Sequence, residues 1–117
     1  MRYLHLFTDD NGEARLEDVD ITLNVVESTL EFSERLPVST IFFARGAAGR
    51  DRAQAPEPRR NWVICLTGSC DITASGETRT LRPGDVMLAD DIDGRGHTSF
   101  TGEGYTAAVI PLDPAST

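Results

Sequence analysis

The sequence predicts an all-β fold with little helix, and three observations support this prediction. Short apolar segments, rich in β-branched and aromatic residues, recur roughly every 8 to 12 residues, which is the spacing of β-sandwiches and barrels. Glycine, proline and asparagine turn signals separate these segments. No segment has the sustained periodicity of a helix of typical length. We therefore expect a jelly-roll barrel, because this architecture closes the edges of its sheets.

The N-terminal strands are expected within residues 1–36. Residues 2–8 alternate weakly between apolar and polar side chains, and the Asn11-Gly12 pair that follows is a hairpin turn signal. The returning strand is expected over residues 14–22. Residues 24–36 fit neither the strand nor the helix period, so we expect strand and loop there, with a short helical turn as the alternative.

The strongest strand signals lie in the middle of the chain. Residues 38–44 are rich in β-branched and aromatic side chains, and we expect this strand inside the fold. Glycine and proline indicate a loop over residues 46–58, after which residues 62–66 are expected as a strand buried on both faces. A loose tail is expected over residues 111–117. The remaining expected strands are residues 70–74, 78–81, 86–89, 98–100 and 105–110.

Charge and composition exclude several classes of function. The 117 residues include 19 Asp and Glu but only 11 basic residues, all arginine, and the net charge of −8 argues against a nucleic-acid partner because phosphate binding needs a basic surface. Without lysine, the chain supports neither Schiff-base chemistry nor a lysine general base. No apolar run reaches the length of a membrane span, and the N-terminus lacks a signal-peptide pattern. We therefore expect a cytoplasmic protein without a membrane partner.

Cys65 and Cys70 are expected to be packed free thiols. Only four residues separate them, and the expected cytoplasmic setting disfavours a disulfide. His5, in the first expected strand, is expected to be a partly exposed strand residue rather than a metal ligand.

The segment over residues 82–97 carries a family resemblance. It combines a Pro83-Gly84-Asp85 turn, a short apolar strand, and a glycine-containing loop that ends at His97. Together with residues 62–68 and 76–79, it resembles the core of a small single-domain cupin. The resemblance implies a cupin-type double-stranded β-helix, which is a jelly-roll barrel. The boundaries it implies are one domain over residues 1–117, a cupin core at about 37–110, N-terminal strands over 1–36 and a tail over 111–117.

The resemblance also implies a metal site, which cupins usually build from three histidines and one glutamate. In this sequence Gly68 matches the end of the first motif, and the glutamate position falls on Asn61. The second motif has about two extra residues and keeps one histidine, His97. The first-motif histidine positions fall on Gln54 and Pro56, or on Ala55 and Glu57 if the spacer is one residue shorter.

One imidazole is too few for a transition-metal site, which generally needs about three or four ligands. We therefore expect no metal and no other cofactor. The alternative is a divalent metal held by His97 with oxygen ligands from Asp90, Asp91, Glu57 or Gln54.

Strand alternation predicts which side chains face the barrel interior. If Asn61 takes the inward position that the resemblance implies, Val63 and Cys65 also point inward. The same counting places His97 and Ser99 on one face of their strand. The result is a mostly apolar pocket with a few polar groups, as small-molecule sites usually are. Its candidate residues are Asn61, Val63, Cys65, His97, Ser99, Gln54 and Glu57.

His97 is the candidate acid–base residue, because imidazole titrates near neutral pH. A carboxylate of the acidic loop over residues 90–93 could orient it; in the alternative, His97 is a structural imidazole hydrogen-bonded to that loop. The loop itself would then be a turn stabilised by its own hydrogen bonds and an ion pair with Arg95. Arg59 and Arg60 are candidate anion contacts at the expected barrel mouth, with ion pairs to acidic residues as the alternative.

Three functions remain open on the sequence alone. The first is a metal-free barrel that binds a small, partly apolar organic molecule. The second is an enzyme, either an isomerase or cyclase that uses His97 as acid–base or a metal-dependent oxygenase with atypical ligands. The third is a non-catalytic dimeric interaction module. The outward side chains Trp62, Ile64 and Leu66 would pack on a second layer or a partner subunit, so we expect a homodimer.

Overall fold

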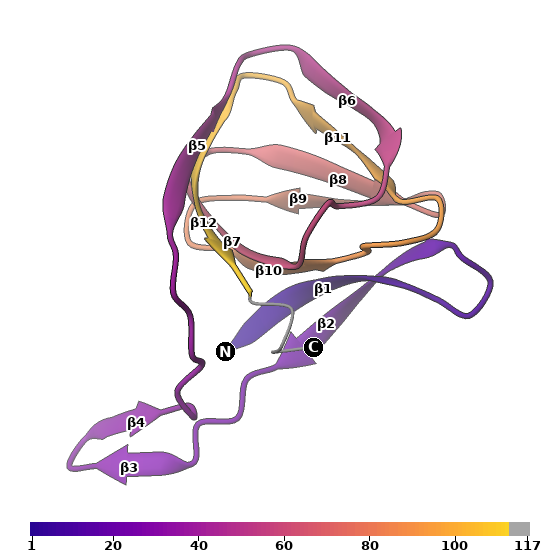
Figure 1. Cartoon of the computed structure of the whole chain (residues 1–117). Helices are drawn as coiled ribbons and strands as arrows, with labels where there is room; N and C mark the ends of the chain where they lie inside the picture. The colour runs from indigo at the N-terminus through magenta and orange to yellow at the C-terminus, as the bar shows by residue number, and fades with distance from the viewer. Residues whose placement is uncertain (113–117) are drawn as a thin grey trace.

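Strands dominate residues 1–112, which are the residues that the computed structural model describes (Figure 1). No helix occurs among them, and hence none long and apolar enough to cross a membrane. The predicted all-β fold is therefore confirmed. The strands are β1 (Arg2–Thr8), β2 (Ala14–Asp20), β3 (Val25–Glu27), β4 (Leu30–Phe32), β5 (Phe42–Gly46), β6 (Arg50–Ala55), β7 (Asn61–Gly68), β8 (Cys70–Ala74), β9 (Glu77–Leu81), β10 (Val86–Asp90), β11 (His97–Thr101) and β12 (Tyr105–Pro111).

Most of these strands form two sheets that enclose the core (Figure 1). The larger sheet has the order β2-β1-β10-β7-β12-β5, and the smaller sheet has the order β6-β11-β8-β9. Neighbouring strands run antiparallel, except that β1 pairs with β10 in parallel, with Leu4 beside Met87. We call residues 21–41, which leave β2 and return to β5, the arm. The hairpin of β3 and β4 projects at its far end (Figure 1).

The core follows the period-two alternation of the strands. On β7, Cys65 is fully buried and Val63 packs against the core, which confirms the inward direction predicted for both. Trp62 and Ile64 point the other way and line a cavity outside the larger sheet. The buried members of the core are Leu4, Leu6, Ala14, Cys65, Cys70, Ile72, Ala74, Leu81, Met87 and Ala89.

The arm differs from its prediction at its C-terminal end. Strand and loop over residues 24–36 are confirmed, with β3 and β4 joined at Ser28, which has a φ of 59°. The prediction of a buried strand over residues 38–44 is confirmed as a strand only from Phe42, where β5 begins, and its burial is wrong, because the Phe43 side chain is 72% exposed. The reason is topological: β5 is an edge strand that pairs only with β12 among the described strands.

Two further elements depart from the sequence predictions. The loop predicted over residues 46–58 is wrong, because Arg50–Ala55 forms β6 and pairs with β11. The polar composition of this segment does not favour a strand, so we attribute the strand to its hydrogen-bonded pairing with β11. The strand predicted as buried on both faces is also wrong in part, since Leu66 on β7 is 46% exposed.

The predicted loose tail is also wrong where the structure describes it. β12 continues to Pro111, and the Leu112 amide donates to the Arg60 carbonyl at 2.9 Å. The rest of the predicted tail, residues 113–117, lies outside the described residues.

Both cysteines are buried free thiols, as predicted. Desolvation, together with a smaller contribution from the neighbouring Asp71 carboxylate, raises the pKa of the Cys70 thiol to about 11. Burial also raises the pKa of Cys65 above its ordinary value. At neutral pH both sulfurs are therefore held as thiols, which are poor nucleophiles.

We predict that the native thiols do not react with Ellman's reagent at pH 7.5, with less than about 0.1 equivalent modified in ten minutes. In guanidinium chloride both of the chain's two cysteines should react. Rapid stoichiometric labelling of the native protein would show that the core around β7 and β8 is open.

Candidate functional site

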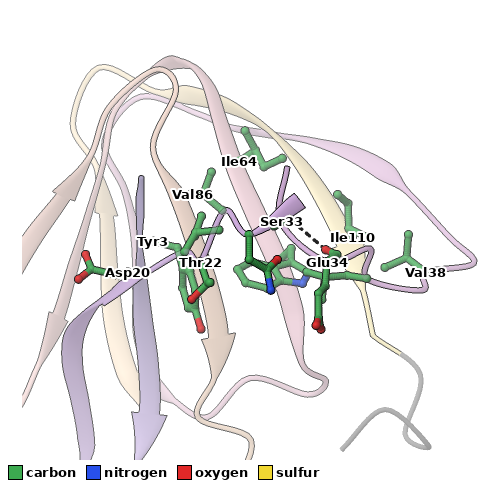
Figure 2. A pocket seen from close by; sticks show the side chains of 13 residues that line it. Tyr3, Asp20, Thr22, Ser33, Glu34, Val38, Ile64, Val86 and Ile110 are labelled. Atoms are coloured by element: carbon green, nitrogen blue, oxygen red, sulfur yellow. Dashed lines mark hydrogen bonds between the residues drawn. The ribbon is translucent and has the colours of Figure 1, made fainter. Parts of the chain in front are cut away.

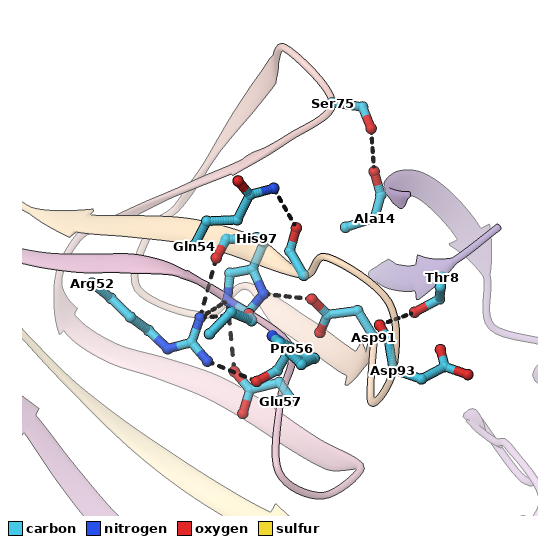
Figure 3. A network of polar contacts seen from close by, with 12 residues as sticks. Thr8, Ala14, Arg52, Gln54, Pro56, Glu57, Ser75, Asp91, Asp93 and His97 are labelled. Carbon is cyan, nitrogen blue, oxygen red and sulfur yellow. Dashed lines mark hydrogen bonds and ion pairs between the residues drawn. The ribbon is translucent and has the colours of Figure 1, made fainter. Parts of the chain in front are cut away.

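Glycines position His97 at the start of β11. Gly94 and Gly96 have φ values of 72° and 76°, in the left-handed region that favours glycine. Gly96 also approaches the backbone of Ala55 so closely that a Cβ atom would overlap the Ala55 carbonyl. This approach brings the connection between β6 and β7 directly against His97 (Figure 3).

The His97 ring is almost completely buried, with 2% of its side chain exposed, and Asp91 beside it is fully buried. Its Nδ1 lies 2.6 Å from Asp91 Oδ2, and its Nε2 lies 3.4 Å from Arg52 Nη1 and 3.6 Å from Glu57 Oε1 (Figure 3). In the neutral ring, Nδ1–H donates to the carboxylate and Nε2 accepts from the guanidinium. Asp91 therefore orients the imidazole, as the sequence suggested for a carboxylate of this loop.

Arg52 and Gln54 connect this ring to the surrounding backbone. The Arg52 guanidinium donates to the carbonyls of Ala55 at 2.9 Å, His97 at 3.2 Å and Pro56 at 3.1 Å. Gln54 Nε2 donates to the Gly96 carbonyl at 3.4 Å. The network thus holds the β6–β7 and β10–β11 connections together.

A second feature lies outside the larger sheet. The outer faces of β1, β10, β7 and β12, together with the arm and the end of β2, border a cavity of about 630 Å³ that we call the outer chamber (Figure 2). Trp62 packs edge-to-face on Tyr3, with ring centroids 4.9 Å apart and planes at 80°. The lining residues are Tyr3, Asp20, Ile21, Thr22, Asn24, Ser33, Glu34, Leu36, Val38, Trp62, Ile64, Val86 and Ile110.

The polar groups of the outer chamber come from the end of β2 and from the arm. Asp20 pairs with Arg2 at 3.0 Å, and both side chains are largely exposed. Ser33 Oγ donates to the Glu34 backbone carbonyl at 2.9 Å, and both residues line the chamber (Figure 2). The wall from the sheet is thus apolar, and the polar groups lie opposite and at the rim.

No family model and no curated protein matches the sequence. Solved structures match it by fold. A cupin 2 conserved barrel domain protein from Salinispora arenicola aligns with a TM-score of 0.52 at 17% identity, over 81% of this chain and 76% of its own. A cupin superfamily protein from Desulfitobacterium hafniense aligns with a TM-score of 0.52 at 18% identity, over 80% of this chain and 83% of its own. The chain has the small cupin fold.

A Salmonella typhimurium protein named for ethanolamine utilization aligns over 96% of this chain and 95% of its own, with a TM-score of 0.53 at 14% identity. At these identities the similarity establishes the fold and no activity. The resemblance drawn from the sequence motifs is thereby confirmed at the level of the fold.

The residues present do not fit the metal that the cupin fold implies. Nδ1 of His97 is taken by Asp91, and Nε2 faces the Arg52 guanidinium, whose positive charge would repel a cation at that nitrogen. Asp91 Oδ1, a buried oxygen with no hydrogen-bond partner among the described residues, would offer one ligand only. Within residues 1–112, no three His, Cys, Asp or Glu side chains gather closely enough to hold a metal ion.

The structure brings some of the predicted site residues together and separates others. Glu57 and Gln54 lie beside His97 and its preceding glycine, and Ser99 is buried on the same face of β11. Asn61, by contrast, donates to the Arg59 carbonyl at 2.9 Å and is not part of the His97 network. A ligand pocket that includes both Asn61 and the residues around His97 stays a prediction.

The structure also shows where the candidate anion contacts Arg59 and Arg60 lie. Arg60 Nε lies 2.7 Å from Asp90, whose other carboxylate oxygen lies 3.1 Å from His5 Nε2. Arg60 is therefore engaged in an ion pair, which is the alternative that the sequence left open. Arg59 is exposed, and its anion contact stays a prediction. Arg95 pairs with Glu13 rather than with the acidic loop.

Sequence reasoning missed Arg52 and the outer chamber. Arg52 lies in the stretch predicted as a loop, so its pairing with Ser99 across β6 and β11, which brings its guanidinium to His97, was not accessible. The outward apolar side chains of the central strands were a usable signal for the chamber. Trp62 and Ile64 were predicted to face outward onto a second layer or a partner, and in the structure both line the chamber.

We predict that Gly96→Ala lowers the free energy of unfolding by about 3 kcal/mol. Two costs add here: the strain of an alanine at positive φ and the overlap of its Cβ atom with Ala55. Gly76→Ala is the matched control: Gly76 has a φ of 80°, but a Cβ atom there meets nothing within 4 Å. It should cost only about 1 kcal/mol. Urea unfolding measures both, and equal losses would mean that the close approach does not constrain the fold.

Proposed function

We propose that this cupin binds a small, largely apolar organic molecule in the outer chamber. The observation that supports this proposal is a cavity of about 630 Å³ with an aromatic and aliphatic wall. Small-molecule sites typically have volumes of about 300 to 1,000 Å³ and similar linings. A ligand that buries about 200 Å² of apolar surface gains about 5 kcal/mol from this burial, before the entropic cost of association is subtracted.

The alternative position is the barrel interior beside His97. Asp91 orients the ring, which favours an acid–base role. However, His97 is 2% exposed and Arg52 and Glu57 both face its Nε2, so a substrate would have to displace them. A ligand deeper inside would also have to displace Cys65, which is fully buried in the core. The outer chamber needs no such rearrangement.

We predict that the neutral dye N-phenyl-1-naphthylamine binds with one site per chain and quenches Trp62 by energy transfer. Trp62 is the only tryptophan and lines the chamber, so its emission reports on this cavity. Ile64→Glu places a charge in the chamber wall and should weaken dye binding about tenfold or more.

Leu66→Glu is the matched control for this experiment. Leu66 lies on the same strand and points the same way, but it does not line the chamber, so binding should change less than about twofold. Equal binding by the wild type and Ile64→Glu, or loss of binding only in His97→Gln, would place the ligand elsewhere.

We also propose that two copies of the chain associate through the arm and β5. The exposed large apolar side chains of the described residues concentrate there, at Val25, Val26, Leu30, Phe32, Leu36, Val38, Ile41, Phe42 and Phe43. An isolated two-stranded hairpin such as β3–β4 is marginally stable in water, and among the described strands β5 pairs on one side only, with β12. A second copy would cover both features with the same surface, as in a two-fold symmetric dimer.

We predict that the wild type sediments as a dimer at about 0.1 mM and that Phe43→Glu shifts it to monomer. Phe100→Glu is the control, because Phe100 is also an exposed aromatic residue but lies on β11 of the other sheet. A monomeric wild type, or dissociation by Phe100→Glu alone, would contradict the arm interface.

A further inference from the structure

The outer chamber has a one-sided charge. Its lining includes two carboxylates, Asp20 and Glu34, and no arginine or histidine among the described residues that border it. The chain has no lysine that could supply a positive charge there. A ligand anion would therefore meet like charges at the rim, and the guanidinium beside that rim, Arg2, is already paired with Asp20.

The two carboxylates differ in what they already bind. Asp20 is paired with Arg2 at 3.0 Å, but both side chains are mostly exposed, and exposed ion pairs of this kind contribute little stability. Glu34 makes no ion pair with the other residues in the described range 1–112. Glu34 lies on the arm and is among the residues that line the cavity (Figure 2).

The aromatic wall suits a cation as well. Trp62 and Tyr3 meet edge to face, so their contact covers a face of only one of the two rings. Tryptophan is the side chain whose face attracts a cation most strongly, at distances up to about 6 Å from the ring centroid. An apolar body against Ile64, Val86 and Ile110 would complete the contact.

From this charge complementarity we infer that the ligand is an amphiphilic organic cation, in which an ammonium group is attached to an aliphatic or arylalkyl body. The inference rests on the proposed binding in the outer chamber and names its ligand class. The ammonium group lies near Glu34 and Asp20, and the apolar body lies on the sheet. The net charge of −8 adds a general attraction for cations.

The test uses three probes with one carbon skeleton: 4-phenylbutylamine, 4-phenylbutan-1-ol and 4-phenylbutyrate, which are cationic, neutral and anionic at pH 7. Each is titrated against Trp62 emission excited at 295 nm in the full-length chain. We expect the amine to bind about tenfold more tightly than the alcohol and the carboxylate more weakly than the alcohol.

Charge variants test the same ligand class independently. Glu34→Gln should reduce the preference for the amine about threefold to fivefold and leave the alcohol unchanged. Glu31→Gln is the matched control, since Glu31 lies on β4 of the same arm but does not line the chamber. Both changes are at exposed positions, and the near-ultraviolet spectrum of Trp62 checks that the chamber is intact.

The outcomes separate the inference from the proposed function. If the alcohol binds as tightly as the amine, or the carboxylate binds most tightly, the cation assignment is wrong and the chamber remains a binding site. If the double variant Glu34→Gln, Asp20→Asn prefers the amine over the alcohol as strongly as the wild type does, the cation assignment is also wrong. If none of the three probes nor the neutral dye binds, both the inference and the proposed function fail.

Discussion

The larger sheet is apolar on both faces at its centre, and this constraint shapes the rest of the molecule. On β7, alternate residues send Val63 and Cys65 into the core and Trp62 and Ile64 to the outside. The smaller sheet covers the inner face (Figure 1). Among residues 1–112, the arm is the segment that covers the outer face, and it does so incompletely. A cavity of about 630 Å³ remains between them, and the arm itself stays exposed.

The incomplete cover on the outer face of the larger sheet also links the chamber to the proposed association of two copies of the chain. Apolar patches of this extent on a soluble domain usually mark binding sites or interfaces. The inner surface of the arm faces the chamber, while residues such as Val26 and Phe43 remain exposed at 68% and 72%. A second copy placed on the arm would hold it against the sheet, so the two proposals reinforce each other. The chamber would then be closed by an element that is marginal on its own.

The fold could be predicted from the sequence because its signals are local. Turn residues such as Gly12 and Gly84 and the alternation around Trp62 predicted most strands and the direction of the β7 side chains. Strand β6 could not be predicted, because its residues Arg50–Ala55 have no strand-like composition and depend on pairing with β11. The chamber depends on four strands brought together from distant parts of the chain, and no local pattern encodes that arrangement.

The His97 network was likewise predictable from the sequence only in part. The sequence identified His97 and proposed that a nearby carboxylate orients it, and the structure places Asp91 Oδ2 at 2.6 Å from Nδ1. It did not identify Arg52, whose guanidinium contacts the ring and three backbone carbonyls. This positive charge stands next to the nitrogen that a metal would need. The network accordingly acts in the fold as a clamp between two loops, whatever chemistry His97 adds.

The most direct test of this account is a crystal structure of the protein grown with 4-phenylbutylamine. The account predicts ligand density between Trp62 and the arm, with the amine nitrogen within hydrogen-bond distance of Glu34 or Asp20. Density inside the barrel beside His97, or a chamber filled by the protein's own side chains, would contradict it.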